Sequence, residues 1–177
     1  MAETKTKKTA TKKTVTNDDL DDKVTFVDSE LEKRVSVHNI SNWKIGMNLK
    51  NEQGSVEFTP NSIQRVTRNE LMSQMNSNNV SLLGIDGKGS HATLYIDDAP
   101  TRRWLGFETK DEPQKIFTDD VARKLFEMSF EDYKRELPNY IVTRAEKYAL
   151  SEAITRLKFN DYRKIMYAKD YTGFPIN

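Results

Sequence analysis

The chain of 177 residues contains no cysteine and only two histidines, His38 and His91. Without cysteine, disulfide bonds, a thiolate nucleophile and thiolate zinc sites are excluded. Neither histidine belongs to a ligand-spaced group such as HExxH, so each is expected to be an ordinary strand residue. A catalytic role for His91 needs an orienting partner that the sequence does not display. We therefore expect no enzyme, no metal site and no cofactor.

The chain also lacks any apolar run that approaches the roughly 20 residues of a transmembrane helix. Its basic N-terminus is not followed by the apolar core of a secretory signal. We therefore expect no membrane association. Charged residues make up 31% of the chain, and the formal net charge is only +1. This balance argues against strong non-specific DNA binding by the folded part, although its tyrosines leave base stacking as a weaker alternative.

Residues 1–22 hold almost no side chain that could bury surface, so they are expected to form a disordered, charged N-terminal arm. The first part of this arm is basic, and four aspartates follow directly. Such an arm can lie along phosphates or an acidic protein surface, or it can be a solvated leader. The candidate contact residues are Lys5, Lys7, Lys8, Lys12 and Lys13.

Closely spaced alternating runs predict a β-rich domain over residues 23–108. The expected strands cover residues 24–27, 34–40, 43–49, 55–58 and 62–66. A short helix over 68–75 is inserted after them, with Thr67 and Glu70 as a capping box. Strands at this spacing are typical of a small antiparallel β-sandwich or barrel.

Two apolar runs within residues 80–98 flank a glycine-bearing turn and predict a β-hairpin. The turn is a possible contact site formed by Gly87, Lys88, Gly89, Ser90 and His91. The GKGS run also resembles part of a phosphate-cradling loop. However, it lacks the full GxxxxGK[ST] frame and leads into a strand rather than a helix, which favours the plain turn.

Residues 109–117 are polar and predict a linker, and residues 118–177 predict a helical domain. Helix caps are expected at Thr118, Ser129, Thr143 with Glu146, and Asn160, and Pro138 is expected to end the second helix. The fold class is therefore α+β, a β domain followed by a C-terminal bundle of three to four helices.

The two tryptophans, Trp43 and Trp104, are candidate anchors for a partner protein. Trp104 lies with Leu105 and Phe107 after a predicted helical turn. These side chains form either a core plug or an exposed anchor. Because large aromatic side chains are usually buried, the plug is favoured.

Three segments, VSVHNISNW, VTRNEL and GKGSHATLYIDDAPTRRWLGFE, resemble small accessory proteins of tailed-bacteriophage virions. The resemblance covers roughly residues 34–177, and no catalytic residue is carried over. It implies a multi-copy virion protein, either a capsid accessory or a neck or tail-connector subunit, assembled in the host cytoplasm on other virion proteins. The alternative hypothesis is a nucleic-acid-binding accessory protein that uses its basic arm.

Overall fold

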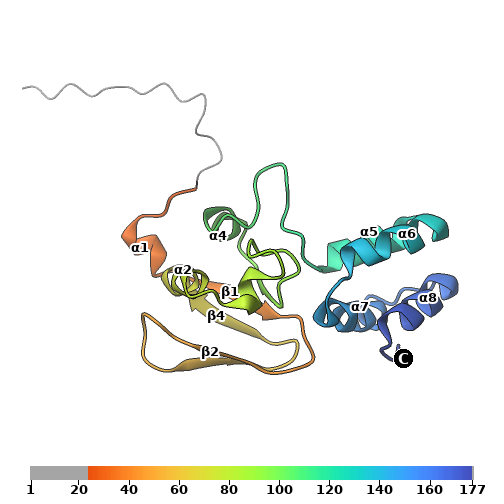
Figure 1. Cartoon of the computed structure of the whole chain (residues 1–177), viewed down its shortest axis with the longest axis horizontal. Coiled ribbons are helices and arrows are strands. Elements are labelled where there is room, and N and C mark those ends of the chain that lie inside the picture. Colours follow the sequence, from red (N-terminus) through yellow and green to blue (C-terminus); the bar gives the residue numbers. More distant parts are fainter. Residues whose placement is uncertain (1–23, 177) are drawn as a thin grey trace, which may run out of the picture.

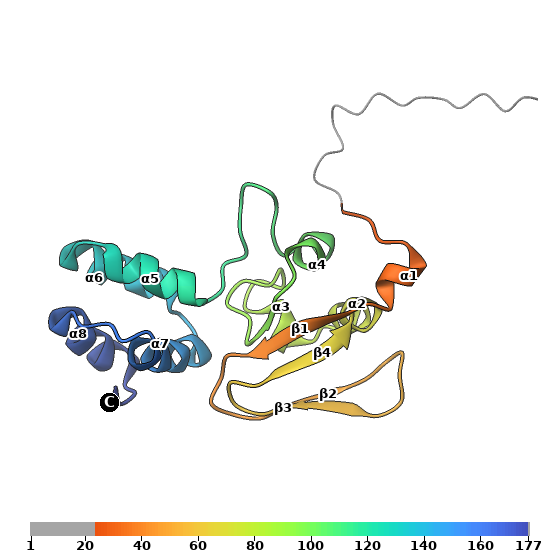
Figure 2. The ribbon, with the colours of Figure 1, turned by 180° about the vertical axis from the view of Figure 1, so that it is seen from behind.

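The computed structural model of this chain describes residues 24–176. The predicted arm of residues 1–22 lies outside the described residues, and so do its five lysines. Figure 1 shows a β-containing unit and, beyond the end of β1 (Arg34–Asn39), a unit made of helices. The view from behind has the same arrangement (Figure 2).

The central strand β1 is hydrogen-bonded on both sides in a three-stranded antiparallel sheet. Its neighbours are β4 (Ile63–Thr67) and β5 (Leu94–Ile96). Side chains along β1 alternate between buried and partly exposed, as expected when one face of a sheet covers a core. A separate hairpin pairs β2 (Ile45–Asn48) with β3 (Ser55–Phe58).

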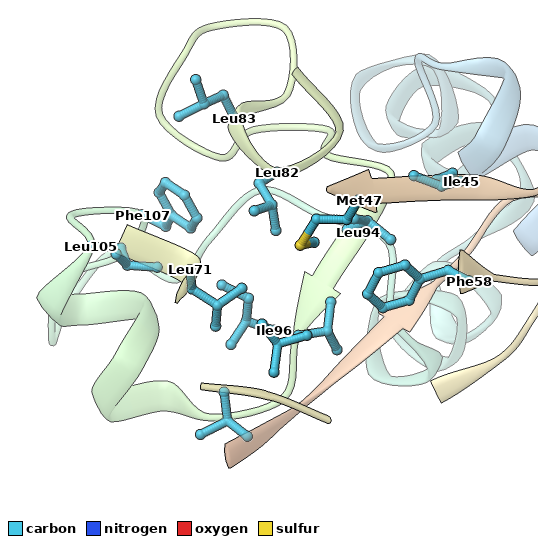
Figure 3. Close-up of a cluster of buried hydrophobic side chains, with 13 residues drawn as sticks. Ile45, Met47, Phe58, Leu71, Leu82, Leu83, Leu94, Ile96, Leu105 and Phe107 are labelled. Carbon is cyan, nitrogen blue, oxygen red and sulfur yellow. The ribbon is translucent and has the colours of Figure 1, made fainter. Parts of the chain in front are cut away.

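Four short helices belong to the β unit; the last three contact strands of this sheet, and the first packs on the second. They are α1 (Asp28–Leu31), α2 (Arg68–Asn76), α3 (Val80–Leu83) and α4 (Ala99–Trp104). Figure 3 shows side chains from α2, α3, β5 and the hairpin converging on one apolar core, among them Leu71, Leu82, Ile96, Met47 and Phe58. Each of these five side chains is at most 1% exposed, and burial of this kind is the main favourable term in folding.

The C-terminal unit contains α5 (Asp119–Glu127), α6 (Phe130–Tyr140), α7 (Arg144–Arg156) and α8 (Tyr162–Thr172). Helix α5 packs on α6 and α7, and α8 packs on α6 and α7. Their apolar stripes meet in a second core around Leu125, Tyr133, Leu137 and Leu150. Ile40, which follows β1, also packs against this core, so the two units touch at this residue.

The α+β class, the inserted helix and the C-terminal helices are confirmed. The Thr118, Ser129 and Thr143 side chains each accept a helix N-cap hydrogen bond. No barrel closes among residues 24–176, where the strands form two separate sheets. The finer prediction of a sandwich or barrel therefore stays a prediction, and so does the division into domains.

The β-hairpin predicted over residues 80–98 is wrong. Its first arm is helix α3, because Asn79 accepts a hydrogen bond from the Ser81 amide and caps the helix. Gly84 ends α3 at φ 65°, and the chain then closes a compact loop. The second arm is β5, whose partner is β1 rather than residues 80–83. The run was too short for its periodicity to separate helix from strand.

Three smaller predictions are also wrong. Residues 24–27 form no strand and lead into α1. Pro138 lies inside α6, which continues to Tyr140. Asp161, not Asn160, caps α8 by accepting a hydrogen bond from the Lys164 amide.

The geometry of the loop after α3 predicts a large difference between two glycine substitutions. A Cβ on Gly84 would lie 1.9 Å from the Ser90 carbonyl oxygen, whereas a Cβ on Gly87 would meet nothing within 4 Å. Both glycines have positive φ. We expect Gly87→Ala to lower the free energy of unfolding by about 1 kcal/mol through backbone strain alone. Gly84→Ala should cost more than about 3 kcal/mol because a backbone clash is added. Equal costs in urea unfolding would contradict this packing.

Candidate interaction surface

The predicted contact residues, 87–91, lie in a loop that is held by bonds within residues 83–91 and to residues 109–117. The Gly89 amide donates to the Leu83 carbonyl and the Ile85 amide to the Ser90 carbonyl. Gln114 Nε2 donates to the Gly89 carbonyl at 2.7 Å, and the His91 amide donates to the Lys115 carbonyl at 2.6 Å. The stretch predicted as a linker therefore lies against this loop.

Several amides of the loop are already engaged and are not free for a phosphate. The Lys88 and Ser90 amides donate to Asp86 Oδ1 at 2.7 and 3.1 Å. Desolvation alone would raise the pKa of Asp86, but hydrogen bonds from Ser90 and the Lys88 amide lower it below its usual value. A carboxylate thus occupies the position a phosphate would take. The geometry supports the plain turn over the phosphate loop.

His91 joins the two units of the protein. Its Nδ1 lies 2.8 Å from Glu146 Oε1, and the two side chains are 10% and 0% exposed. The other carboxylate oxygen, Oε2, accepts hydrogen bonds from the amides of Val142 and Thr143. His91 also takes a left-handed backbone conformation, with φ 56°. The acidic partner that the sequence did not display therefore exists, but its second oxygen closes the cap of α7.

Trp104 is partly buried and packs against the core of the β unit. Its ring meets Phe26 edge-on at 5.3 Å. Phe26 in turn lies under the Arg68 guanidinium, whose carbon is 4.0 Å from the ring centroid. Trp104 therefore takes the plug position rather than that of a free anchor.

Arg68 is 3% exposed and connects three parts of the β unit. It donates to Thr101 Oγ1 at 2.8 Å, to the Glu30 carbonyl at 3.2 Å and to Asp98 Oδ2 at 3.0 Å. Desolvation alone would raise the pKa of the Asp98 carboxyl, but the hydrogen bonds from Thr101 and Arg68 outweigh it and lower the pKa. Such pairing is what a buried cation requires.

Trp43 is 39% exposed, in the connection between β1 and β2. Its backbone is fixed by Asn39, a 1% exposed residue whose Nδ2 lies 2.8 Å from the Trp43 carbonyl oxygen. Asn39 Nδ2 also lies within bonding distance of the Phe58 and Thr59 carbonyls, and its Oδ1 accepts from Ser41. The clamp fixes the backbone that carries the exposed Trp43 side chain, which suits a contact residue.

The sheet formed by β4, β1 and β5 has a second face, turned away from the core. We call it the open sheet face. Register places Ile63, His38 and Tyr95 side by side across the three strands. Ile63 is 54% exposed, and the rings of His38 and Tyr95 meet edge-on with centroids 6.0 Å apart. Ser36 and Arg65 form the next cross-strand pair on this face.

The structure thus brings His91 to the junction of the units, keeps Ser90 within its own loop, and places Trp43 and Trp104 in separate neighbourhoods. Sequence analysis missed the open sheet face. Alternation along residues 34–40 already placed His38 opposite the buried valines. The partners Ile63 and Tyr95 could not be assigned, because that requires the pairing of β1 with two strands far along the chain.

None of the helices within residues 24–176 has the length and apolar content that a bilayer crossing requires. Over the same residues, no group of three or more metal-ligating side chains comes together. Comparisons with family models, with curated proteins and with solved structures found no match to this chain.

The buried junction predicts a large effect of Glu146→Ala. The substitution removes the partner of His91 and leaves the amides of Val142 and Thr143 without their acceptor. We expect the free energy of unfolding to fall by about 3–5 kcal/mol. Thr143→Ala, which removes only a cap side chain, should cost about 1 kcal/mol. Urea unfolding measures both, and a Glu146→Ala cost no larger than that of Thr143→Ala would argue against the junction.

The lowered pKa of Asp98 predicts a stability change at acid pH. Because the folded pKa lies below the unfolded value of about 3.9, the ionised carboxyl stabilises the protein above that pH. This contribution is lost as pH falls through the folded pKa. Asp98→Asn keeps a residue that can cap α4 but removes the charge, so it should lower stability at pH 7 by about 1–3 kcal/mol.

The difference between Asp98→Asn and the wild type should shrink below about pH 4. Asp97→Asn is the matched control because the Asp97 side chain is 61% exposed. A difference between Asp98→Asn and the wild type that stays constant from pH 7 to pH 2 would show that the charge of Asp98 does not act in this way.

Proposed function

We propose that this chain is a non-enzymatic structural protein of a tailed-phage virion, either a capsid accessory or a neck or tail-connector subunit. It docks on other virion proteins through the open sheet face and its N-terminal arm, in many copies per particle. The family resemblance of residues 34–177 supports the virion context. The open sheet face is the observation that carries the docking role.

An antiparallel sheet with one face on its core commonly turns a polar face to water. Here Ile63 stands on that face with more than half of its side chain exposed, in a row with His38 and Tyr95. A rigid apolar and aromatic row with polar neighbours is the composition that interface centres favour. Arg102 lies over the Tyr95 ring, 5.0 Å from its centroid, and fixes that ring for contact.

Two fully buried carboxylates, Glu70 and Glu146, are engaged in holding the fold. Both oxygens of Glu146 accept hydrogen bonds or contact His91. The Glu70 carboxylate is 0% exposed and accepts from the amides of Lys50 and Asn51. A scaffold that keeps its surface geometry fixed agrees with a docking role.

The direct test is whether purified virions of the encoding phage contain this chain in a fixed number of copies per particle. Quantitative mass spectrometry of the virions gives that number, and the proposal expects a ratio that is constant between preparations. Absence from purified virions would overturn it. The nucleic-acid alternative expects salt-dependent DNA binding that disappears when residues 1–13 are removed.

The open sheet face predicts a loss of docking in Ile63→Lys. A charged head on this row has to be desolvated when a partner covers it, so incorporation into virions should fall by about tenfold or more. Val80→Lys is the matched control, because Val80 is 76% exposed but lies on α3, away from this face. Both variants should keep the wild-type melting temperature. Equal incorporation of the two variants would exclude the open sheet face as the docking surface.

A further inference from the structure

A hollow on the surface of the helical unit is lined by two positively charged side chains from the start of α7. It has a volume of about 370 Å³ and lies where the start of α7 meets the end of α8. Arg144 and Lys147 contribute the charge, and Thr172 also lines the hollow. Val142 and Phe174 add apolar surface at the same place. We call this the basic hollow.

The two cations of the basic hollow have no carboxylate partner among residues 24–176. Arg144 makes no side-chain hydrogen bond or ion pair within that range, and Lys147 Nζ lies 4.5 Å above the Tyr171 ring. Glu146, the acid on α7 next to these residues in the sequence, already contacts His91 and accepts a hydrogen bond from the Val142 amide at the helix cap. An adjoining hollow, lined in part by Lys169 and Asp170, carries charges of both signs. Uncompensated positive charge is therefore confined to the Arg144 and Lys147 side.

The chain itself contains a segment of matching chemistry. Residues 17–22 read NDDLDD, four carboxylates around a single leucine. Carboxylates match Arg144 and Lys147, while Leu20 matches the apolar surface of Val142 and Phe174. The lysine-rich part of the arm has the wrong sign for this hollow.

Helix α1, the first described element after the acidic segment, lies on the opposite side of the β unit from the helical unit that carries the basic hollow (Figure 1). Asp18 is six residues from Val24, so it reaches at most about 20 Å beyond it. Val24 precedes α1 at one end of β1, and the helical unit lies beyond the other end (Figure 1). Strand β1 alone spans about 17 Å. A second copy can present its segment without this restriction.

We infer that the acidic segment of residues 17–22 docks in the basic hollow of a second copy of this chain. The contact joins two different surfaces, so it is head-to-tail and can link copies into a ring or a row. The inference deepens the proposed function and rests on it for its biological setting, since it names what the N-terminal arm holds in a multi-copy assembly.

Charge reversal on each side tests the contact in the full chain. The hollow variant is Arg144→Glu with Lys147→Glu. The arm variant combines the substitutions Asp18→Lys, Asp19→Lys, Asp21→Lys and Asp22→Lys. Sedimentation velocity at increasing concentration should show salt-sensitive self-association of the wild type. Each variant alone should associate about tenfold more weakly or worse. The control is Arg123→Glu with Lys158→Glu, which makes the same charge change outside the hollow and should associate like the wild type.

Mixing the two variants provides the decisive measurement. In the mixture, the lysine arm of one variant faces the acidic hollow of the other, and the native arm of the second faces the native hollow of the first. Association should return to within about threefold of the wild type, because complementary charge is restored at both contacts. Circular dichroism melting of each variant shows whether it is folded, and Arg144→Glu alone serves if the double variant unfolds.

Three outcomes would overturn the inference. The wild type does not self-associate, the hollow variant associates as strongly as the wild type, or the control variant associates as weakly as the hollow variant. A different result would overturn the proposed function. A chain present in virions without arm-to-hollow association keeps that function, whereas a self-associating chain absent from virions loses it.

Discussion

The pairing of β1 on both of its edges is the constraint on which the rest of the structure depends. Successive side chains of a strand point to opposite faces, and the bonds from β4 and β5 fix which set of β1 side chains faces the core. Val35 and Val37 bring the helices and the β2–β3 hairpin to one face, and His38 leaves an open face on the other. At the end of the strand, Asn39 clamps the next turn, and Ile40 reaches the helical core. A one-residue slip of β1 would reverse all of these assignments together.

Buried charges at the starts of helices hold the remaining parts to this sheet. Glu70 and Glu146 occupy the same place in the same local motif, three residues after a capping threonine. Glu146 completes its capping box and also meets His91 from the other unit. Glu70 instead turns to the amides of Lys50 and Asn51 and holds the hairpin end against α2. The local pattern sets the start of each helix, while tertiary structure decides what the carboxylate binds.

The same distinction explains how much could be predicted from the sequence. Strand β3 and helix α2 were predicted nearly to the residue, because alternation and caps are local signals. Residues 80–83 were predicted as a strand because four apolar-rich residues fit either period, and the cap by Asn79 was not recognised. The partner of His91 could not be predicted, because Glu146 is 55 residues away and becomes a neighbour only when the units pack. The open sheet face was hidden for the same reason.

The placement of these features separates what holds the molecule from what it can offer a partner. Arg68, Glu70 and Glu146 are nearly inaccessible, and each has two or more polar contacts. Ile63 and Arg144 have accessible side chains and face away from both cores. Desolvating either one therefore breaks no buried bond of the fold, so a partner can cover it without loss of internal stability. Surfaces of this kind on both units would let one copy contact more than one neighbour, as the proposed multi-copy assembly requires.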